Sequence, residues 1–357
     1  MSEEEVVVYA RERELAFVAD TFLKACIFSA SQHVNTWIFG SRRYHGEDRA
    51  CCNARARNGV TFIQARAQMA TRVTPSQQTG AALAGTLRLG DRVVNRLGFG
   101  AMRLCGAQVW GRHDDPDNAA RVLKRALDLG INFIDTADSY GPEVNESVIA
   151  EVLHPYPQGL VIATKGGLTR PEPSAWVENG HPEHLRRALD GSLKRLRVDC
   201  IDLYQLHAPD PKVPYVDSVG ALAEQQRAGK IRHLGISNVT VAQLDEARRI
   251  TDIVSVQNEF NVGNRADQDV LDACTRLGIA FLPWYPLGGA GDIATANVKR
   301  IARRRGITPS QVAIAWLLAR SPVVLPIPGT QSVGHLEENI AAAGITLASE
   351  ELEALES

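Results

Sequence analysis

The sequence of 357 residues lacks the features that mark membrane, secreted or nucleic-acid-binding proteins. No apolar run approaches the roughly 20 residues that span a bilayer, so we expect no membrane partner. The first residues, MSEEE, are acidic and do not resemble the basic start of a secretion signal. Lys and Arg number 39 against 41 Asp and Glu, and this net charge of −2 gives no electrostatic reason to expect nucleic acid.

Cysteine is scarce and is not spaced as metal sites require. The six cysteines are Cys26, Cys51, Cys52, Cys105, Cys200 and Cys274. Only Cys51 and Cys52 lie close in sequence, and adjacent cysteines rarely form a disulfide. We therefore expect reduced thiols, a cytoplasmic location and no metal site.

The glycine fingerprint of a dinucleotide-binding Rossmann domain is also missing. That motif reads G-x-G-x-x-G directly after an early strand. The nearest candidate, GFGAMRLCG, places its glycines at Gly98, Gly100 and Gly106, which is the wrong spacing. A doubly wound open sheet is therefore the weaker of two fold hypotheses.

The chain divides into three regions by composition. Residues 1–68 hold three of the six cysteines and show no sustained period of 2 or 3.6, so we expect a peripheral or poorly ordered extension. Met69 is an alternative start, and a genuine appended region is the other interpretation. Residues 69–85 are small and polar, as is typical of a linker. Residues 86–357 carry the regular pattern of a folded domain.

From residue 86 onward, short apolar runs alternate with amphipathic helical stretches. TLRLGDRVV, around Gly90 and Asp91, indicates a β-hairpin. The apolar runs span residues 96–102, 131–137, 159–165, 200–207, 231–238, 253–260, 279–287 and 323–329. Such strands, separated by helices, predict a parallel sheet covered on both faces. Eight units predict an α/β fold, a (β/α)₈ TIM barrel of roughly 250 residues, with the N-terminal hairpin closing the barrel bottom.

Polar side chains collect at one end of the predicted strands, the end where this barrel type places its active site. Asp135 follows the apolar run INFI, and Tyr140 lies in the next loop. Lys165 follows VIAT, and His207 follows YQL. Later strand ends carry Ser237, Asn238, Gln257 and Trp284.

The first four of these residues form a chemically coherent set. An unpaired buried carboxylate is costly, so Asp135 needs a cation, and Lys165 is the candidate. A lysine paired with a carboxylate stays protonated and would lower the pKa of a nearby Tyr140, making it a general acid near neutrality. His207 could orient a carbonyl oxygen. Each residue alone has an ordinary structural explanation, but four of them on three successive strand ends favour a catalytic site.

Residues 86–357 resemble the aldo-keto reductase superfamily. The motifs occur in that family's order and spacing: GFGAMRL, NFIDTADSYG, IATKGG, DLYQLH, GISN, VQNEFN and IPGT…HLEENIAA. The resemblance implies that Tyr140 is the general acid, that Asp135 and Lys165 tune it, and that His207 orients the substrate. It also implies NAD(P)H bound in an extended form across the barrel mouth.

The same resemblance assigns cofactor-binding residues. Ser237, Asn238 and Gln257 would hold the nicotinamide carboxamide, and Trp284 would stack on the ring. The segment along the pyrophosphate would include Leu287, Gly288, Gly289 and Gly291. The adenosine end would meet Gly329, Thr330, His335, Glu338 and Asn339.

NADP(H) is the favoured cofactor, and NAD(H) is the alternative. Members that require NADPH often carry a lysine and an arginine against the 2′-phosphate, where this chain has Gly329 and His335. Thr330 and the N-terminus of a helix beginning near Val333 can still bind phosphate through hydroxyl, amide and dipole.

Within the superfamily, the chain looks most like the bacterial pyridoxal reductase (pyridoxine 4-dehydrogenase) branch. The similar segments are GAMRL with VWG, DSYGPEVNE, HPYP, ATKGGLTRP and LHAPDPKVP. This likeness implies pyridoxal as a carbonyl substrate. Trp110 and Trp176 fall in the loops after the first and third strands, where a flat aromatic aldehyde could stack between the two rings. Simple loop packing is the other interpretation.

Reduction of a small-molecule aldehyde or ketone is the leading hypothesis, and two other functions stay open. A Schiff-base aldolase would use Lys165 as its nucleophile, although pairing with Asp135 would keep that amine charged. A non-catalytic NADP(H)-binding accessory or sensor subunit would use the N-terminal extension as its interaction arm.

Overall fold

The computed structural model describes residues 80–115, 117–288 and 295–356. The expected extension 1–68 lies outside the described residues, as does most of the expected linker 69–85. The described end of that linker forms a 3-10 helix, η1 (Gly80–Ala84), with Ala81 buried. The amide of Ala81 donates to the carbonyl of Leu129 at 2.9 Å, which anchors η1 to the domain that follows.

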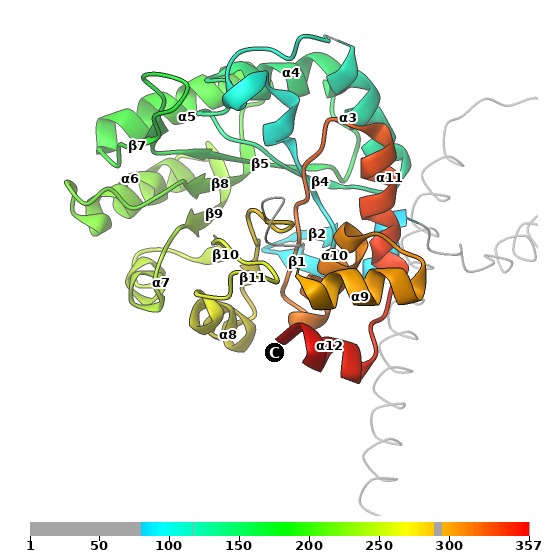
Figure 1. The fold of residues 1–357 in the computed structure, drawn as a ribbon. Coiled ribbons are helices and arrows are strands. Elements are labelled where there is room, and N and C mark those ends of the chain that lie inside the picture. The colour runs from blue at the N-terminus through cyan, green and yellow to red at the C-terminus, as the bar shows by residue number, and fades with distance from the viewer. Residues whose placement is uncertain (1–79, 116, 289–294, 357) are drawn as a thin grey trace, which may run out of the picture. The chain divides into compact units, whose positions relative to one another are not determined.

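The centre of this domain is a curled sheet of seven parallel strands, in the order β11-β10-β9-β8-β5-β4-β3 (Figure 1). Their bounds are β3 (Phe99–Gly100), β4 (Phe133–Asp135), β5 (Val161–Gly166), β8 (Ile201–Leu206), β9 (Ile231–Ser237), β10 (Ile253–Gln257) and β11 (Ala280–Phe281). Each neighbour follows in sequence order around the curl, and this arrangement confirms the predicted α/β fold built on parallel strands.

The eighth predicted strand lies between β11 and β3 but forms only isolated ladder contacts. Phe281 donates its amide to Val323, and Gly98 donates its amide to Pro326, both at 2.9 Å. The segment 323–328 contains two prolines, which have no N–H to contribute to a ladder. This segment therefore joins the two edges of the curled sheet without being a regular strand.

Helices cover the outer face of the sheet (Figure 1). Their bounds are α3 (Asn118–Asp128), α4 (Val144–Leu153), α5 (Pro182–Leu196), α6 (Tyr215–Arg227), α7 (Val241–Arg248), α8 (Gln268–Leu277), α9 (Ala296–Arg305), α10 (Pro309–Arg320), α11 (Val333–Ala341) and α12 (Ser349–Glu356). Gly278 after α8 and Gly306 after α9 are both left-handed and end these helices. In the described ranges, no helix is long and apolar enough to cross a membrane.

The period of two along each strand places the buried charges of Asp135 and Lys165 inside the barrel near its carboxyl end. Phe133, Val161 and Leu203 pack in one interior cluster. Because alternate residues share a face, Asp135 lies above Phe133, and Lys165 lies above Val161 on the same interior side. The neighbouring positions face the helices and join a separate, larger apolar cluster.

A hairpin covers the opposite end of the sheet. Strands β1 (Thr86–Leu89) and β2 (Arg92–Asn95) pair antiparallel around Gly90, whose φ is +59°. Leu89 and Val94 join the interior cluster. Arg92 pairs with Asp202 at the start of β8, at 2.5 Å. The hairpin thus contacts the beginnings of the strands and leaves their carboxyl ends free for a site.

Candidate active site

A cavity of about 570 Å³ opens at the carboxyl ends of the strands. It is lined by residues from most strands and from the closing segment. These include Gly100, Met102, Arg103, Asp135, Tyr140, Leu168, Trp176, His207, Ser237, Asn238, Gln257, Trp284, Tyr285, Leu287, Gly288, Ile327 and Gly329. The residues predicted from separate strand ends therefore surround one space.

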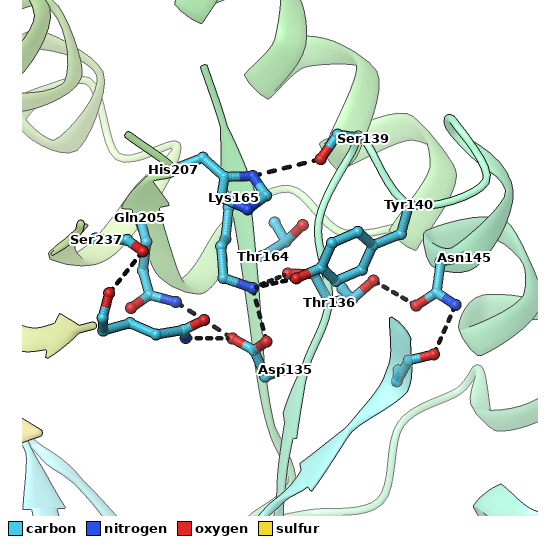
Figure 2. A network of polar contacts seen from close by, with 12 residues as sticks. Asp135, Thr136, Ser139, Tyr140, Asn145, Thr164, Lys165, Gln205, His207 and Ser237 are labelled. Carbon is cyan, nitrogen blue, oxygen red and sulfur yellow. Dashed lines mark hydrogen bonds and ion pairs between the residues drawn. The ribbon is translucent and has the colours of Figure 1, made fainter. Parts of the chain in front are cut away.

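A buried ion pair lies at the floor of this cavity. Lys165 Nζ is 2.6 Å from Asp135 Oδ2, and the two side chains are 0% and 3% exposed. The other carboxylate oxygen of Asp135 accepts hydrogen bonds from the Nε2 atoms of Gln257 at 2.9 Å and Gln205 at 3.3 Å. The carboxylate is therefore both paired and hydrogen-bonded, as a buried charge requires (Figure 2).

Lys165 connects this carboxylate to the phenol of Tyr140. Its Nζ also donates to the carbonyl of Thr136 at 2.9 Å and to the Tyr140 hydroxyl at 3.3 Å. Burial lowers the pKa of Lys165, but the charges of Asp135 and Tyr140 and the hydrogen bonds to both groups together outweigh burial and leave that pKa above its ordinary value. The ammonium therefore stays protonated, as predicted.

The predicted fall in the pKa of Tyr140 is wrong. The Tyr140 side chain is buried, and burial of the phenol raises its pKa more than the charge of Lys165 lowers it. The nearby charge of Asp135 adds to the rise. A raised pKa keeps the phenol protonated through the neutral range, so Tyr140 remains a proton donor.

His207 faces Tyr140 from the end of β8. The two rings lie edge to face, with centroids 5.9 Å apart and an interplanar angle of 79°. Its Nδ1 is 3.3 Å from the Ser139 hydroxyl. Burial first, and the charge of Lys165 second, place the pKa of His207 well below its ordinary value. The imidazole is therefore neutral beside the phenol.

The residues predicted to bind the nicotinamide lie together on one side of the cavity. Asn238 has a left-handed φ of +59° and donates from Nδ2 to the carbonyl of His207 at 2.9 Å. Trp284 Nε1 donates to Asn238 Oδ1 at 3.0 Å, and the Ser237 hydroxyl donates to the carbonyl of Gln257 at 2.7 Å. Leu287 and Gly288 line the same cavity, whereas Gly289 and Gly291 lie outside the described residues.

A second cavity of about 580 Å³ continues from the first one, with which it shares Arg103 and Gly329. Its other lining residues are His113, Asp115, Asn118, Thr330, Gln331, Ser332 and His335. Of the residues predicted for the adenosine end, Gly329, Thr330 and His335 line this space. Glu338 and Asn339 do not: Glu338 is an exposed residue of α11, and Asn339 is buried.

The predicted slot between two tryptophan rings is occupied by a protein side chain. The Arg170 guanidinium lies 3.6 Å from the ring centroid of Trp176 and 5.7 Å from that of Trp110. Trp176 lines the cavity, but Trp110 does not. The prediction that a flat aldehyde stacks between these two indoles is therefore wrong. Of the two indoles, only Trp176 is placed to contact a molecule in the cavity.

Sequence reasoning missed three residues that shape the site. Gln205 could have been found, since it alternates with Leu203 on β8 and must face the interior beside Asp135. Arg103 follows the first strand in GAMRL and lines both cavities. Asn145 ties two loops together, because it accepts from Thr136 Oγ1 at 2.6 Å and donates to the carbonyl of Ala101 at 2.9 Å (Figure 2).

Comparison with known proteins identifies the class. The Aldo/keto reductase family model matches residues 96–357. An uncharacterized oxidoreductase of Schizosaccharomyces pombe is 50% identical over 285 residues, covering 78% of this chain and 92% of the relative. The pyridoxine 4-dehydrogenase of Escherichia coli is 45% identical over 277 residues, covering 76% of this chain and 97% of the relative.

A solved structure with a similar fold belongs to the same class as these sequence relatives. The aldo/keto reductase from Klebsiella pneumoniae, in complex with NADP and acetate, is 26% identical, with a TM-score of 0.63 over 76% of this chain and 93% of its own. The chain belongs to the aldo/keto reductase family. It is an NAD(P)H-dependent oxidoreductase that interconverts a carbonyl compound and an alcohol.

Replacing Lys165 by Met should destabilise the protein strongly. Asp135 would remain buried without its cation, which costs about 3–5 kcal/mol of unfolding free energy. Lys230→Met is the matched control, because Lys230 pairs with Asp190 at the surface, and such pairs contribute only about 0–1 kcal/mol. Urea denaturation measures both. Equal losses in the two variants would show that the buried pair has no special role.

Proposed function

We propose that Tyr140 protonates the carbonyl oxygen of the substrate while the bound nicotinamide cofactor supplies a hydride to the carbonyl carbon. The observation that carries this assignment is that Tyr140 lines the cavity and its hydroxyl lies 3.3 Å from Lys165 Nζ. Lys165 then stabilises the phenolate that forms, and Asp135 holds the ammonium in place. Low water access around this buried group strengthens both interactions.

His207 orients the carbonyl in this proposal. Its imidazole is neutral and borders both Tyr140 and the cavity. In the tautomer where the Ser139 hydroxyl donates to Nδ1, the Nε2 atom carries the proton and can donate to the carbonyl oxygen. Tyr140 and His207 would thus approach the same oxygen from two sides.

The two adjoining cavities fit an extended dinucleotide. Ser237, Asn238 and Gln257 would hold the carboxamide of the nicotinamide, and Trp284 would pack on its ring. The pyrophosphate would follow Leu287, Gly288, Gly289 and Gly291, where backbone amides can approach anionic oxygens. Gly329, Thr330 and His335 would contact the adenosine end, whereas Glu338 and Asn339, which the sequence also suggested, do not line this cavity.

NADP(H) is the proposed cofactor in preference to NAD(H). The second cavity gathers Arg103, His113 and His335, and its carboxylate, Asp115, pairs with Arg121 at 2.5 Å. Arg103 can supply a cation beside Gly329, where the adjoining sequence has no lysine or arginine. Arg103 has no ion-pair partner among the described residues, and such a guanidinium favours a phosphate-bearing ribose through charge-assisted hydrogen bonds.

Pyridoxal is the proposed substrate class, with reduction to the corresponding alcohol. The support is the 45% identity to the pyridoxine 4-dehydrogenase of E. coli and the indole of Trp176 on the cavity wall. A Schiff-base aldolase is disfavoured, since Lys165 Nζ has oxygen partners on Asp135, Thr136 and Tyr140 and stays protonated.

The proposed catalytic unit is residues 86–357, with 1–68 as an extension and 69–85 as a linker whose described end, η1, packs on the catalytic unit through Ala81. The match of the family model to residues 96–357 supports this division. We also propose a cytoplasmic location, which the free thiols of Cys105, Cys200 and Cys274 favour.

Replacing Tyr140 by Phe should reduce the turnover number for aldehyde reduction by about 10²–10⁴-fold, the usual contribution of a general acid. NADPH affinity should change by less than about twofold, since the phenol acts in the chemical step. Steady-state kinetics and fluorescence titration measure the two quantities. Tyr156→Phe is the control, because the Tyr156 hydroxyl donates to the carbonyl of Leu196, away from the cavity. Full activity of Tyr140→Phe would refute the assignment.

The enzyme should use NADPH at least about tenfold more efficiently than NADH in kcat/KM, and Arg103→Ala should remove most of that preference. The physical reason is the loss of a charge-assisted contact worth about 1.5–3 kcal/mol to the phosphate. Rates with NADH should stay nearly unchanged in Arg103→Ala. A wild-type preference of more than tenfold for NADH would contradict the proposal.

A further inference from the structure

Arg170 is a buried cation that holds two active-site loops together. It is 7% exposed. Its guanidinium donates to the carbonyls of Gln108 at 3.1 Å and Val109 at 3.4 Å in the loop after β3. It also donates to the carbonyl of Pro173 at 2.5 Å, in its own loop after β5. One planar group thus connects segments that are some 62 positions apart in sequence.

The loop that Arg170 holds has a strained backbone. Gln108 and Val109 have φ values of 55° and 57°. Residues other than glycine rarely adopt this region of backbone conformation, and β-branched residues such as valine adopt it least of all. Both of their carbonyls accept from Arg170. Because hydrogen bonds from a charged donor are strong, Arg170 helps to maintain this conformation.

The same guanidinium supports an aromatic wall of the cavity. It lies 3.6 Å from the ring centroid of Trp176, the geometry of a cation–π stack. Trp176 is 39% exposed and lies in the loop that joins β6 (Leu168–Thr169) to β7 (Val177–Glu178). Its ring meets that of Tyr140 edge to face, with centroids 6.2 Å apart. The position of this exposed indole therefore depends on the stack with Arg170.

We propose that Arg170 is a positioning residue that fixes Trp176 beside Tyr140 and thereby makes the cavity selective for aromatic over small aliphatic aldehydes. This inference rests on the proposed carbonyl reduction. An aromatic aldehyde gains contact with a held indole, whereas an aliphatic aldehyde of three carbons gains little. Arg170 does not line the cavity and acts through Trp176.

Kinetics with 4-nitrobenzaldehyde and propanal test the proposal. Arg170→Met should raise KM for 4-nitrobenzaldehyde about 5- to 10-fold, within the range of a cation–π contact, and should change its kcat by less than about twofold. KM for propanal and the affinity for NADPH should change by less than about twofold. Equal KM increases for both aldehydes would overturn the proposal.

A double-mutant cycle separates action through Trp176 from a general structural effect. In a Trp176→Ala background, Arg170→Met should leave KM for 4-nitrobenzaldehyde unchanged. A further loss there would contradict the proposal. Arg170→Lys retains the charge without the planar fork and should behave like Arg170→Met, so it carries the test if the latter does not fold. Arg112→Gln is the control, because Arg112 lies in the same loop region but pairs with Glu151 at the surface.

Calorimetric titration with benzoate tests the role of Arg170 without relying on turnover. The dissociation constant of benzoate should be about 5- to 10-fold higher in Arg170→Met than in the wild type. The double variant Arg170→Met/Trp176→Ala should have the same dissociation constant as Trp176→Ala alone. If the wild-type protein reduces neither aldehyde, the proposed function fails. The positioning role of Arg170 is still decided by the benzoate titration, and equal affinity of wild type and Arg170→Met would refute it.

Discussion

The buried pair of Lys165 and Asp135 is the interaction on which the rest of the site depends. Two opposite charges inside a protein are tolerated only when their geometry is good and their remaining groups are hydrogen-bonded. Here Gln205 and Gln257 complete the shell of the carboxylate, and Thr136 and Tyr140 complete that of the ammonium. The phenol is therefore one member of a network that the barrel interior holds fixed.

Strand geometry places the two charged groups of this network, and the loop after β4 adds Thr136 and Tyr140. Side chains of period two put Phe133 below Asp135 and Val161 below Lys165, so the interior changes from apolar to polar in one layer. The hairpin β1–β2 covers the apolar end, and the open end carries the cavity. The substrate side is built differently, from loops that Arg170 ties together across the mouth.

Much of this arrangement could be predicted from sequence because parallel strands bring their carboxyl ends to one edge. That rule alone placed Asp135, Lys165 and His207 together. The direction of the shift in the pKa of Tyr140 could not be predicted, since it depends on how far burial removes the phenol from water. Arg170 was also missed, because a cation held by carbonyls and an indole leaves no charge pattern in the sequence. The eighth strand was predicted as regular, but its two prolines lack the N–H groups that a regular ladder of hydrogen bonds needs.

Transfer of deuterium is the most direct test of the central claim that this cavity performs hydride transfer to a carbonyl. The wild-type enzyme would be supplied with NADPH deuterated at the reactive C4 position and an aromatic aldehyde. Mass spectrometry and NMR would then locate the label. One deuterium is expected on the carbinol carbon of the alcohol product, and none at that carbon from deuterated water. An unlabelled carbinol carbon, or label taken from solvent, would contradict that claim.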